Sequence, residues 1–185
     1  MSVIAQAGAK GRQLHKFGGS SLADVKCYLR VAGIMADYSQ PDDMMVVSAA
    51  GSTTNQLISW LKLSQTDRLS AHQVQQALRR YQSELISGLL PPEVADGLIG
   101  AFIHDLERLA GLLDSGVNDA VYAEVVGHGE VWSARLMSAV LNQQGLESAW
   151  LDARDFLRAE RGAQPQVDEG LSYPLLQQLL AQHPG

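Results

Sequence analysis

The apolar run at residues 44–49 constrains what this chain can fold into more than any other segment. Its length and its Val46-Val47 pair are typical of a strand buried on both faces of a parallel sheet. Residues 14–17 form a shorter candidate strand, and a diglycine follows it at once. Between the two strands, apolar residues recur at spacings of three and four, which predicts a helix. These residues are Leu22, Val25, Leu29 and Ala32.

The middle of the chain is predicted to be helical. Ser70 and Gln73 have the spacing of a capping box at the start of one apolar stripe. The pair Pro91-Pro92 breaks the chain, and a second apolar stripe follows. We expect these two helices to pack antiparallel, as a hairpin insertion that spans residues 67–116.

The remaining elements complete an α/β pattern. Asn118 can cap a further helix that ends near Gly145, and residues 147–151 form a candidate third strand. Residues 171–182 are predicted to form a last amphipathic helix. The fold class is therefore α/β, a three-layer sandwich with a mainly parallel sheet and a helical hairpin insertion.

Composition limits the kinds of partner. Apolar residues make up 46% and charged residues 18% of the chain, which is the balance of a globular protein. The net charge is -6 and no basic stripe is present, so we expect no nucleic-acid partner. Cys27 is the single cysteine, which excludes an internal disulfide and a thiolate metal site. No apolar stretch has the ~20 residues of a membrane span, and residues 1–12 have no signal-peptide pattern, so we expect no membrane partner and a cytoplasmic location.

Residues 16–21, with the sequence Lys-Phe-Gly-Gly-Ser-Ser, carry the strongest chemical signal. A diglycine between a strand and a helix lets the backbone approach a ligand, and free N–H groups there favour an anion. Lys16 can stabilise the charge that develops on a transferred phosphoryl group, and Ser20 adds a hydroxyl. The lysine precedes the glycines, so this is not a Walker A loop, and the third glycine of a dinucleotide fingerprint is missing. The residues alone leave open a tight turn with Lys16 as a solvated charge.

Two further segments carry candidate site residues. Ser48 ends the buried strand, where ligands bind in open α/β sheets, and the Thr54 hydroxyl follows in the next loop. The alternative for Thr54 is a helix cap. Glu130 follows Gly127 and Gly129 within a predicted helix, where each glycine costs about 1 kcal/mol relative to alanine. That cost indicates a close approach to this turn, although a solvated helix glutamate is the alternative.

Three other polar residues, His128, Asp152 and Asp155, are not predicted to belong to a functional site. His128 has no second histidine at ligand spacing, so no metal site is predicted. Asp152 and Asp155 follow the candidate third strand, but either can cap a helix instead of serving a site.

Taken together, three sequence blocks resemble the aspartate kinases of the amino-acid kinase superfamily. Residues 16–21 resemble the family's Lys-Phe-Gly-Gly-Thr-Ser opening, with Ser20 in place of the threonine. Residues 46–55 are similar to its Val-Ser-Ala strand end and threonine loop, and residues 127–134 are similar to its Gly-Glu-x-x-Ser helix. The blocks occur in the family's order over essentially the whole chain.

The resemblance implies phosphoryl transfer from ATP, with Mg²⁺ carried by the ATP phosphates, to the side-chain carboxylate of L-aspartate. The product would be 4-phospho-L-aspartate, the entry to lysine, threonine and methionine biosynthesis. The resemblance also implies two sets of site residues. Those that bind the phosphates of ATP are Lys16, which is also catalytic, Gly18, Gly19 and Ser20. Those that bind aspartate are Ser48, Thr54 and Glu130.

Sequence motifs of the family's nucleotide half do not occur in residues 1–185. We therefore expect the N-terminal portion of a catalytic domain, without the nucleotide half and without regulatory or dehydrogenase domains. The full-length protein is expected to be a homo-oligomer, and this chain by itself to be inactive. Two alternatives stay open. One is a superfamily member that acts on a different acid or a carbamate, against which Glu130 speaks because a carboxylate suits an α-ammonium group. The other is a non-catalytic module of the same fold that binds partners.

Overall fold

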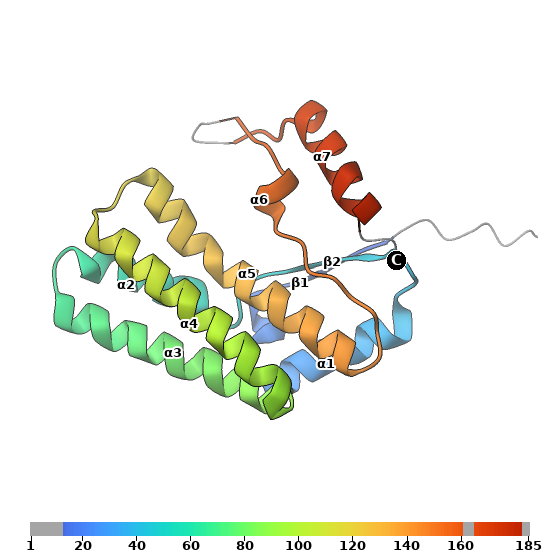
Figure 1. Cartoon of the computed structure of the whole chain (residues 1–185), viewed down its shortest axis with the longest axis horizontal. Coiled ribbons are helices and arrows are strands. Elements are labelled where there is room, and N and C mark those ends of the chain that lie inside the picture. The colour runs from blue at the N-terminus through green and yellow to red at the C-terminus, as the bar shows by residue number, and fades with distance from the viewer. Residues whose placement is uncertain (1–12, 161–164, 183–185) are drawn as a thin grey trace, which may run out of the picture.

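A computed structural model of the chain describes residues 13–160 and 165–182, so the N-terminal residues 1–12 lie outside it. Strand β1 (Leu14–Phe17) pairs in parallel with strand β2 (Met44–Val47) (Figure 1). In this register Lys16 lies opposite Val46. A short 3₁₀ helix, η1 (Gly19–Leu22), and helix α1 (Val25–Tyr38) connect the two strands. The predicted strand–helix–strand unit with a parallel sheet is confirmed.

The two faces of the sheet differ in burial. Phe17, Met45 and Val47 pack against the hydrophobic core. On the opposite face, Leu14 is 65% exposed and Val46 is 44% exposed. The prediction that residues 44–49 are buried on both faces is therefore wrong for the described residues, since the core packs against only one face of β2.

Helix α1 begins at Val25 rather than at Leu22 as predicted. The Asp24 carboxylate accepts the N–H of Cys27 at 2.7 Å and so caps the helix, while Leu22 is fully buried within η1. The buried face of α1 also differs from the predicted one, since Leu29 is 46% exposed. The buried residues of α1 are Tyr28, Val31, Ala32 and Met35.

Four long helices follow: α2 (Thr53–Ser64), α3 (Arg68–Leu89), α4 (Pro92–Asp114) and α5 (Asp119–Gln143). Pro91-Pro92 separates α3 from α4 as predicted, and the side chain of Asn118 caps α5 by accepting the N–H of Val121. The predicted capping box at Ser70 is wrong. Asp67 caps α3 instead, because its carboxylate accepts the N–H groups of Leu69 and Ser70 and also the Ser70 hydroxyl.

Side chains from these helices interdigitate in one core. The Phe102 and Trp132 rings meet edge to face with their centroids 4.8 Å apart, which joins α4 to α5. On α4, the predicted apolar stripe is buried at Phe102, Leu106, Leu109 and Leu113.

The predicted third strand at residues 147–151 is absent, and the described residues contain only a two-stranded sheet. Gly145 ends α5 with a φ of +79°, a value that favours glycine. Beyond it, the Asn142 amide accepts the N–H of Ser148 and donates to its carbonyl, at 2.9 and 2.8 Å, and Ser138 donates to the same carbonyl. Side chains of α5 therefore satisfy this backbone, and no neighbouring strand is needed.

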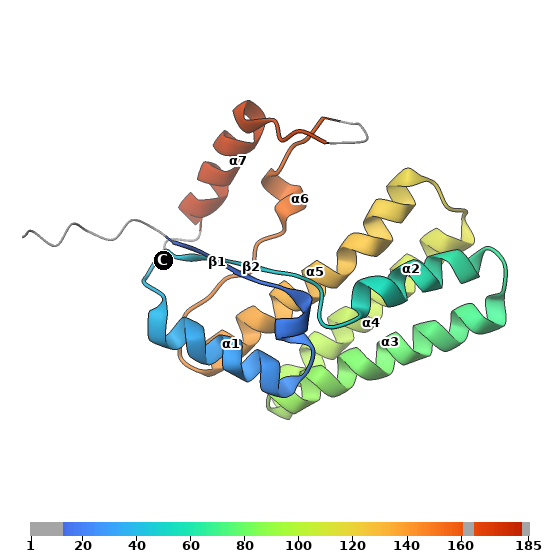
Figure 2. The ribbon, with the colours of Figure 1, turned by 180° about the vertical axis from the view of Figure 1, so that it is seen from behind.

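The chain ends with helix α6 (Ala153–Phe156) and helix α7 (Glu169–Gln182). Figures 1 and 2 show α7 above the two strands and α1 below them. In the described ranges no helix is both long and apolar enough to cross a membrane.

Candidate functional site

The carboxyl ends of β1 and β2 bring the first two sequence blocks together. We call residues 18–23 the β1 loop and residues 48–54 the β2 loop. The N–H of Ser48 donates to the Phe17 carbonyl, and the N–H of Gly51 donates to the Gly19 carbonyl, both at 3.0 Å. The two loops therefore lie side by side at the sheet edge where open α/β folds bind their ligands.

Close packing between the two loops explains Gly19. A Cβ atom at this position would lie 2.6 Å from the Ala49 carbonyl oxygen and 3.3 Å from that of Gly51. Gly51 itself has a φ of +53°, which side chains rarely tolerate. A Cβ atom at Gly18 would meet nothing within 4 Å, so packing of the described residues does not require that glycine.

Helix α5 adds the third sequence block to the same place. The Glu130 carboxylate accepts the N–H of Ala49 at 3.3 Å through Oε1. A Cβ atom at Gly129 would lie 2.6 Å from Ala49 Cβ and 3.2 Å from Thr53 Cγ2. The predicted close approach is therefore confirmed at Gly129. It is wrong at Gly127, beside which nothing lies within 4 Å.

Four candidate side chains keep their polar groups available. Lys16 and Ser20 are exposed, while Ser48 and Thr54 are half-buried. No hydrogen bond or ion pair joins any of these side chains to the rest of residues 13–160 and 165–182. The structure thus places Ser48 and Glu130 at the same strand end, but it forms no ion pair between Lys16 and Glu130.

The helix behind the β1 loop does not face it as the sequence suggested. The loop passes into η1, which has four residues, and α1 begins only after Asp24. The Asp24 carboxylate occupies the start of α1, and its hydrogen bond from the N–H of Cys27 lowers the pKa of Asp24. Attraction of an anion to this loop therefore depends on Lys16 and on the loop's own N–H groups, with no contribution from a long helix.

Two buried hydroxyls beside the site have structural roles. Thr53 is fully buried, donates to the Ala50 carbonyl at 2.6 Å and accepts from the Gln82 amide at 3.0 Å. Helix α2 starts at Thr53, so Thr54 is not its cap. On α5, Ser133 accepts from the Tyr28 hydroxyl at 3.2 Å, and burial raises the pKa of Tyr28.

Sequence reasoning missed Thr53 and Gln82. The one available signal is position, because Gln82 lies four residues after Leu78 and three before Leu85, both of which are buried in the core. A polar residue at a core position of a helix needs a partner, and that partner is found on a distant segment.

His128 belongs to a structural network. Its Nε2 lies 2.8 Å from an Arg108 nitrogen, and its Nδ1 lies 2.7 Å from the Glu124 carbonyl. Arginine can only donate, so Nε2 accepts and Nδ1 carries the proton of a neutral ring. Burial lowers the pKa of His128, which favours this neutral form. Within the described residues, no three His, Cys, Asp or Glu side chains are grouped so that they could hold a metal ion.

Comparison with known proteins shows which family this chain belongs to. The model of the "Amino acid kinase family" matches residues 11–184. The chain belongs to this family. It is 90% identical, over 185 residues, to bifunctional aspartokinase/homoserine dehydrogenase 2 of Escherichia coli (strain K12). The matched region covers 100% of this chain and 23% of the relative. Lysine-sensitive aspartokinase 3 of the same organism is 28% identical over 144 residues, or 77% of this chain and 31% of the relative. The chain thus spans less than a third of the length of these relatives.

Solved structures agree with the family assignment. Aspartokinase III of E. coli in complex with lysine and aspartate superposes with a TM-score of 0.81 at 24% identity, over 92% of this chain and 38% of that chain. The complex of the same enzyme with aspartate and ADP gives a TM-score of 0.79 at 25% identity and the same coverage. The expected amino-acid kinase fold and the resemblance to aspartate kinases are confirmed.

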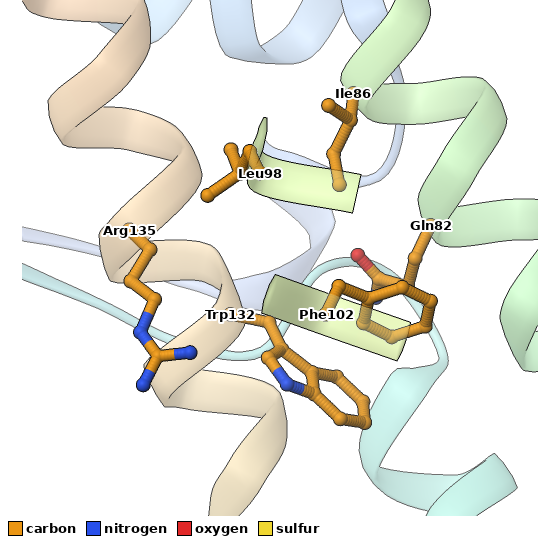
Figure 3. A pocket seen from close by; sticks show the side chains of 6 residues that line it. All are labelled: Gln82, Ile86, Leu98, Phe102, Trp132 and Arg135. Carbon is orange, nitrogen blue, oxygen red and sulfur yellow. The ribbon is translucent and has the colours of Figure 1, made fainter. Parts of the chain in front are cut away.

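Two recesses of this amino acid kinase chain lie away from the strand ends. A cavity of about 10 Å³, room for about one water molecule, lies between α3, α4 and α5, and Figure 3 shows the side chains that line it. None of its lining residues belongs to the β1 or β2 loop; they are Gln82, Ile86, Leu98, Phe102, Trp132 and Arg135. A wider recess of about 390 Å³ lies beside the C-terminal end of α2, at the Ser64–Thr66 turn, a helix length of roughly 18 Å from the β2 loop.

Proposed function

We propose that this chain supplies the aspartate-binding and phosphate-facing part of an aspartokinase. In the reaction, a phosphoryl group passes from ATP to the side-chain carboxylate of L-aspartate and gives 4-phospho-L-aspartate. The observation that supports this most is the meeting of three separate segments at Ala49, where the β1 loop, the β2 loop and Glu130 come together. The aspartokinase relatives, and the aspartate and ADP bound to a structural neighbour, support the same reaction.

The aspartate pocket in this proposal lies between the β2 loop and α5. Glu130 Oε1 accepts the N–H of Ala49, and Oε2 is available to the α-ammonium group of the substrate. A charge-assisted hydrogen bond of this kind is stronger than a neutral one. The free hydroxyls of Ser48, which directly follows β2, and of Thr54, in the first turn of α2, bind the polar groups of aspartate in this proposal.

The phosphate-facing part consists of Lys16, Gly18, Gly19 and Ser20. Lys16 lies at the end of β1, exposed and without an ion-pair partner in the described residues, so its full charge is available to the transferred group. That charge stabilises negative charge that grows in the transition state, which is how proteins catalyse phosphoryl transfer. The backbone of Gly18 and Gly19 and the Ser20 hydroxyl bind phosphate oxygens, and Mg²⁺ enters with the ATP phosphates.

The wider assignment follows the family. The product would enter lysine, threonine and methionine biosynthesis in the cytoplasm, and the full-length enzyme would be a homo-oligomer. Adenine contacts and the second set of phosphate contacts would come from segments of the family outside residues 1–185.

A chimaera tests this function directly. In it, this chain replaces the matching 23% of the E. coli bifunctional relative. Coupled detection of ADP release should show turnover that depends on L-aspartate. Glu130 is exposed, and Glu130→Gln keeps the shape of its side chain and removes its charge. The loss of a hydrogen bond to a charged group, about 1.5–3 kcal/mol, should raise the KM for aspartate roughly 10- to 150-fold while the KM for ATP stays unchanged.

Glu107→Gln is the matched control, because Glu107 is an exposed glutamate on α4 away from the loops. It should leave both KM values unchanged. Equal losses of aspartate and ATP affinity in Glu130→Gln would make Glu130 a structural residue. A chimaera without any aspartate-dependent turnover would support the non-catalytic alternative.

A further inference from the structure

Two neighbouring residues of α3 contact both loops of the site. The Tyr81 hydroxyl donates to the Ala23 carbonyl at 2.9 Å, at the end of the β1 loop. The same hydroxyl oxygen lies only 2.9 Å from where a Cβ atom of Gly51 would be, so it also borders the β2 loop. Tyr81 therefore sits where the two loops meet.

Gln82 extends this contact into the β2 loop. Its side chain is buried, with 3% exposure, and its amide donates to the Thr53 hydroxyl, which in turn donates to the Ala50 carbonyl. Thr53 also faces α5, because its Cγ2 lies 3.2 Å from the Cβ position of Gly129. A continuous chain of contacts therefore runs from α3 through the β2 loop to the residue that precedes Glu130.

The core itself does not need a polar residue at position 82. Figure 3 shows Gln82 reaching from α3 towards Phe102 and Trp132, beside a cavity that holds no more than about one water molecule. A buried amide is costly unless it is hydrogen-bonded, whereas an apolar side chain of similar volume fills such a place without that requirement. The hydrogen bond to Thr53 is thus what the glutamine provides and an apolar residue would not.

We propose that Tyr81 and Gln82 are positioning residues of the active site, which fix the β1 loop relative to the β2 loop. This inference rests on the proposed function, because it assumes that the two loops hold the phosphate and the aspartate. Neither residue touches a substrate. They act by holding the β1 loop, with Gly19 and Ser20, in place against the β2 loop, so the hairpin of α3 and α4 keeps the phosphate-binding groups at the right separation from the aspartate-binding groups. Small errors in such a separation slow a reaction strongly.

Conservative substitutions test the proposal in the chimaera. Tyr81→Phe removes only the hydroxyl, and Gln82→Met replaces the amide with an apolar side chain of similar length. Each should lower kcat/KM for aspartate by about tenfold, the scale of one lost hydrogen bond, and the double variant by up to about 100-fold. Thr53→Val removes the hydrogen bond from Gln82 and also the one from its own hydroxyl to the Ala50 carbonyl, so it should cost at least as much as Gln82→Met, and the two together should cost no more than Thr53→Val alone. Thr53→Ser keeps the hydroxyl and should retain activity.

Two controls separate positioning from general destabilisation. Ile86→Val lies on the same helix, is buried and contacts neither loop through a hydrogen bond, so it should lower stability without changing kcat/KM. Tyr122→Phe removes an exposed hydroxyl on α5 and should change nothing. If Tyr81→Phe and Gln82→Met keep parental kcat/KM, or lose activity only in step with Ile86→Val, the proposal is overturned.

Hydrogen–deuterium exchange on the 185-residue chain gives a readout that does not require activity. Backbone amides of residues 18–23 and 48–54 should exchange faster in Tyr81→Phe and Gln82→Met than in the parent and in Ile86→Val. Unchanged exchange in these loops overturns the positioning role even if the parent chimaera is inactive. An inactive parent chimaera with faster loop exchange in the variants would refute the proposed function and leave the brace between the loops established.

Discussion

Two glycines of α5 provide a matched pair of substitutions that tests the geometry of the site. Gly129→Ala places a methyl group 2.6 Å from Ala49 Cβ and 3.2 Å from Thr53 Cγ2, whereas Gly127→Ala meets nothing within 4 Å. Both glycines lie in the interior of the same helix, and neither has a positive φ. The helix propensity is therefore equal at the two positions, and only the packing differs.

The expected magnitudes follow from that difference. Alanine in place of glycine in a helix interior gains about 1 kcal/mol, so Gly127→Ala should raise the free energy of unfolding by about that amount. At Gly129 the same gain is opposed by overpacking, which costs about 1–3 kcal/mol. Carbon atoms prefer a separation of about 3.5–4.0 Å, so α5 and the β2 loop must part by roughly 1 Å. The new methyl group at position 129 and the Ala49 methyl group are both bonded directly to the backbone and cannot rotate away from each other. The overpacking cost therefore lies in the upper part of the range of about 1–3 kcal/mol. Gly129→Ala should therefore lose about 1–2 kcal/mol, and the two variants should differ by about 2–3 kcal/mol.

Urea unfolding of the chain, followed by tryptophan fluorescence, measures this difference. Trp60 and Trp132 are buried and report on the core that joins α2 to α5. With a slope of about 1–3 kcal/mol per molar urea, a difference of about 2–3 kcal/mol should separate the two midpoints by about 0.7–3 M. Equal midpoints for Gly127→Ala and Gly129→Ala would refute the close contact between α5 and the β2 loop, and with it the placement of Glu130 at the strand end.

Three further outcomes are expected. In the chimaera, Lys16→Ala should lower kcat about 100- to 1,000-fold, which is roughly 2.7–4 kcal/mol of activation free energy, with little change in the KM for aspartate, because in the proposed mechanism the lysine faces charge that grows in the transition state; an unchanged kcat would remove Lys16 from the mechanism. The 185-residue chain alone should release no ADP in response to L-aspartate above a Lys16→Ala blank, and turnover above that blank would mean that a complete ATP site lies within these residues. Burial lowers the pKa of His128 below its ordinary 6.5, so the unfolded chain binds a proton at this residue more tightly than the folded chain does. The stability that the neutral histidine contributes is fully present above pH 6.5 and is lost as the pH falls through the folded-state pKa. The free energy of unfolding, compared at pH 5.5 and 7.5, should therefore fall in the parent and fall less in His128→Gln, and equal slopes would contradict a buried neutral histidine.

The sequence predicts those parts of the fold that local patterns determine. The two strands, the connecting helix, the break at Pro91-Pro92 and the Asn118 cap depend on residues a few positions apart, and the structure contains all of them. The errors come from contacts between distant segments. Residues 147–151 have a strand-like composition, but Asn142 and Ser138 satisfy the backbone of Ser148, so no strand forms there. The burial of residues 44–49 was overestimated because composition does not reveal that one sheet face stays exposed.

The candidate site shows the same division. Short motifs identified Ser48, Thr54 and Glu130, and the structure places Ser48 and Glu130 at one strand end. The supporting residues could not be found in this way. Tyr81 and Gln82 lie 58 and 29 residues from their partners Ala23 and Thr53. In the sequence, Tyr81 fits the apolar stripe of an ordinary helix, and Gln82 is one of several polar residues of that helix. A motif lists groups that meet a substrate, whereas the residues that align those groups are defined only by the tertiary contacts.

Ala49 explains how three separate segments can form one site. It is buried, with 3% exposure, and it has a different neighbour on each side. Its carbonyl oxygen leaves no room for a side chain at Gly19, its Cβ leaves none at Gly129, and its N–H donates to Glu130. A larger residue at Gly19, Ala49 or Gly129 would push a loop or α5 away from the strand end. The candidate site is thus shaped by close contacts between small residues of three segments, and a substrate bound as proposed would meet groups already held in place.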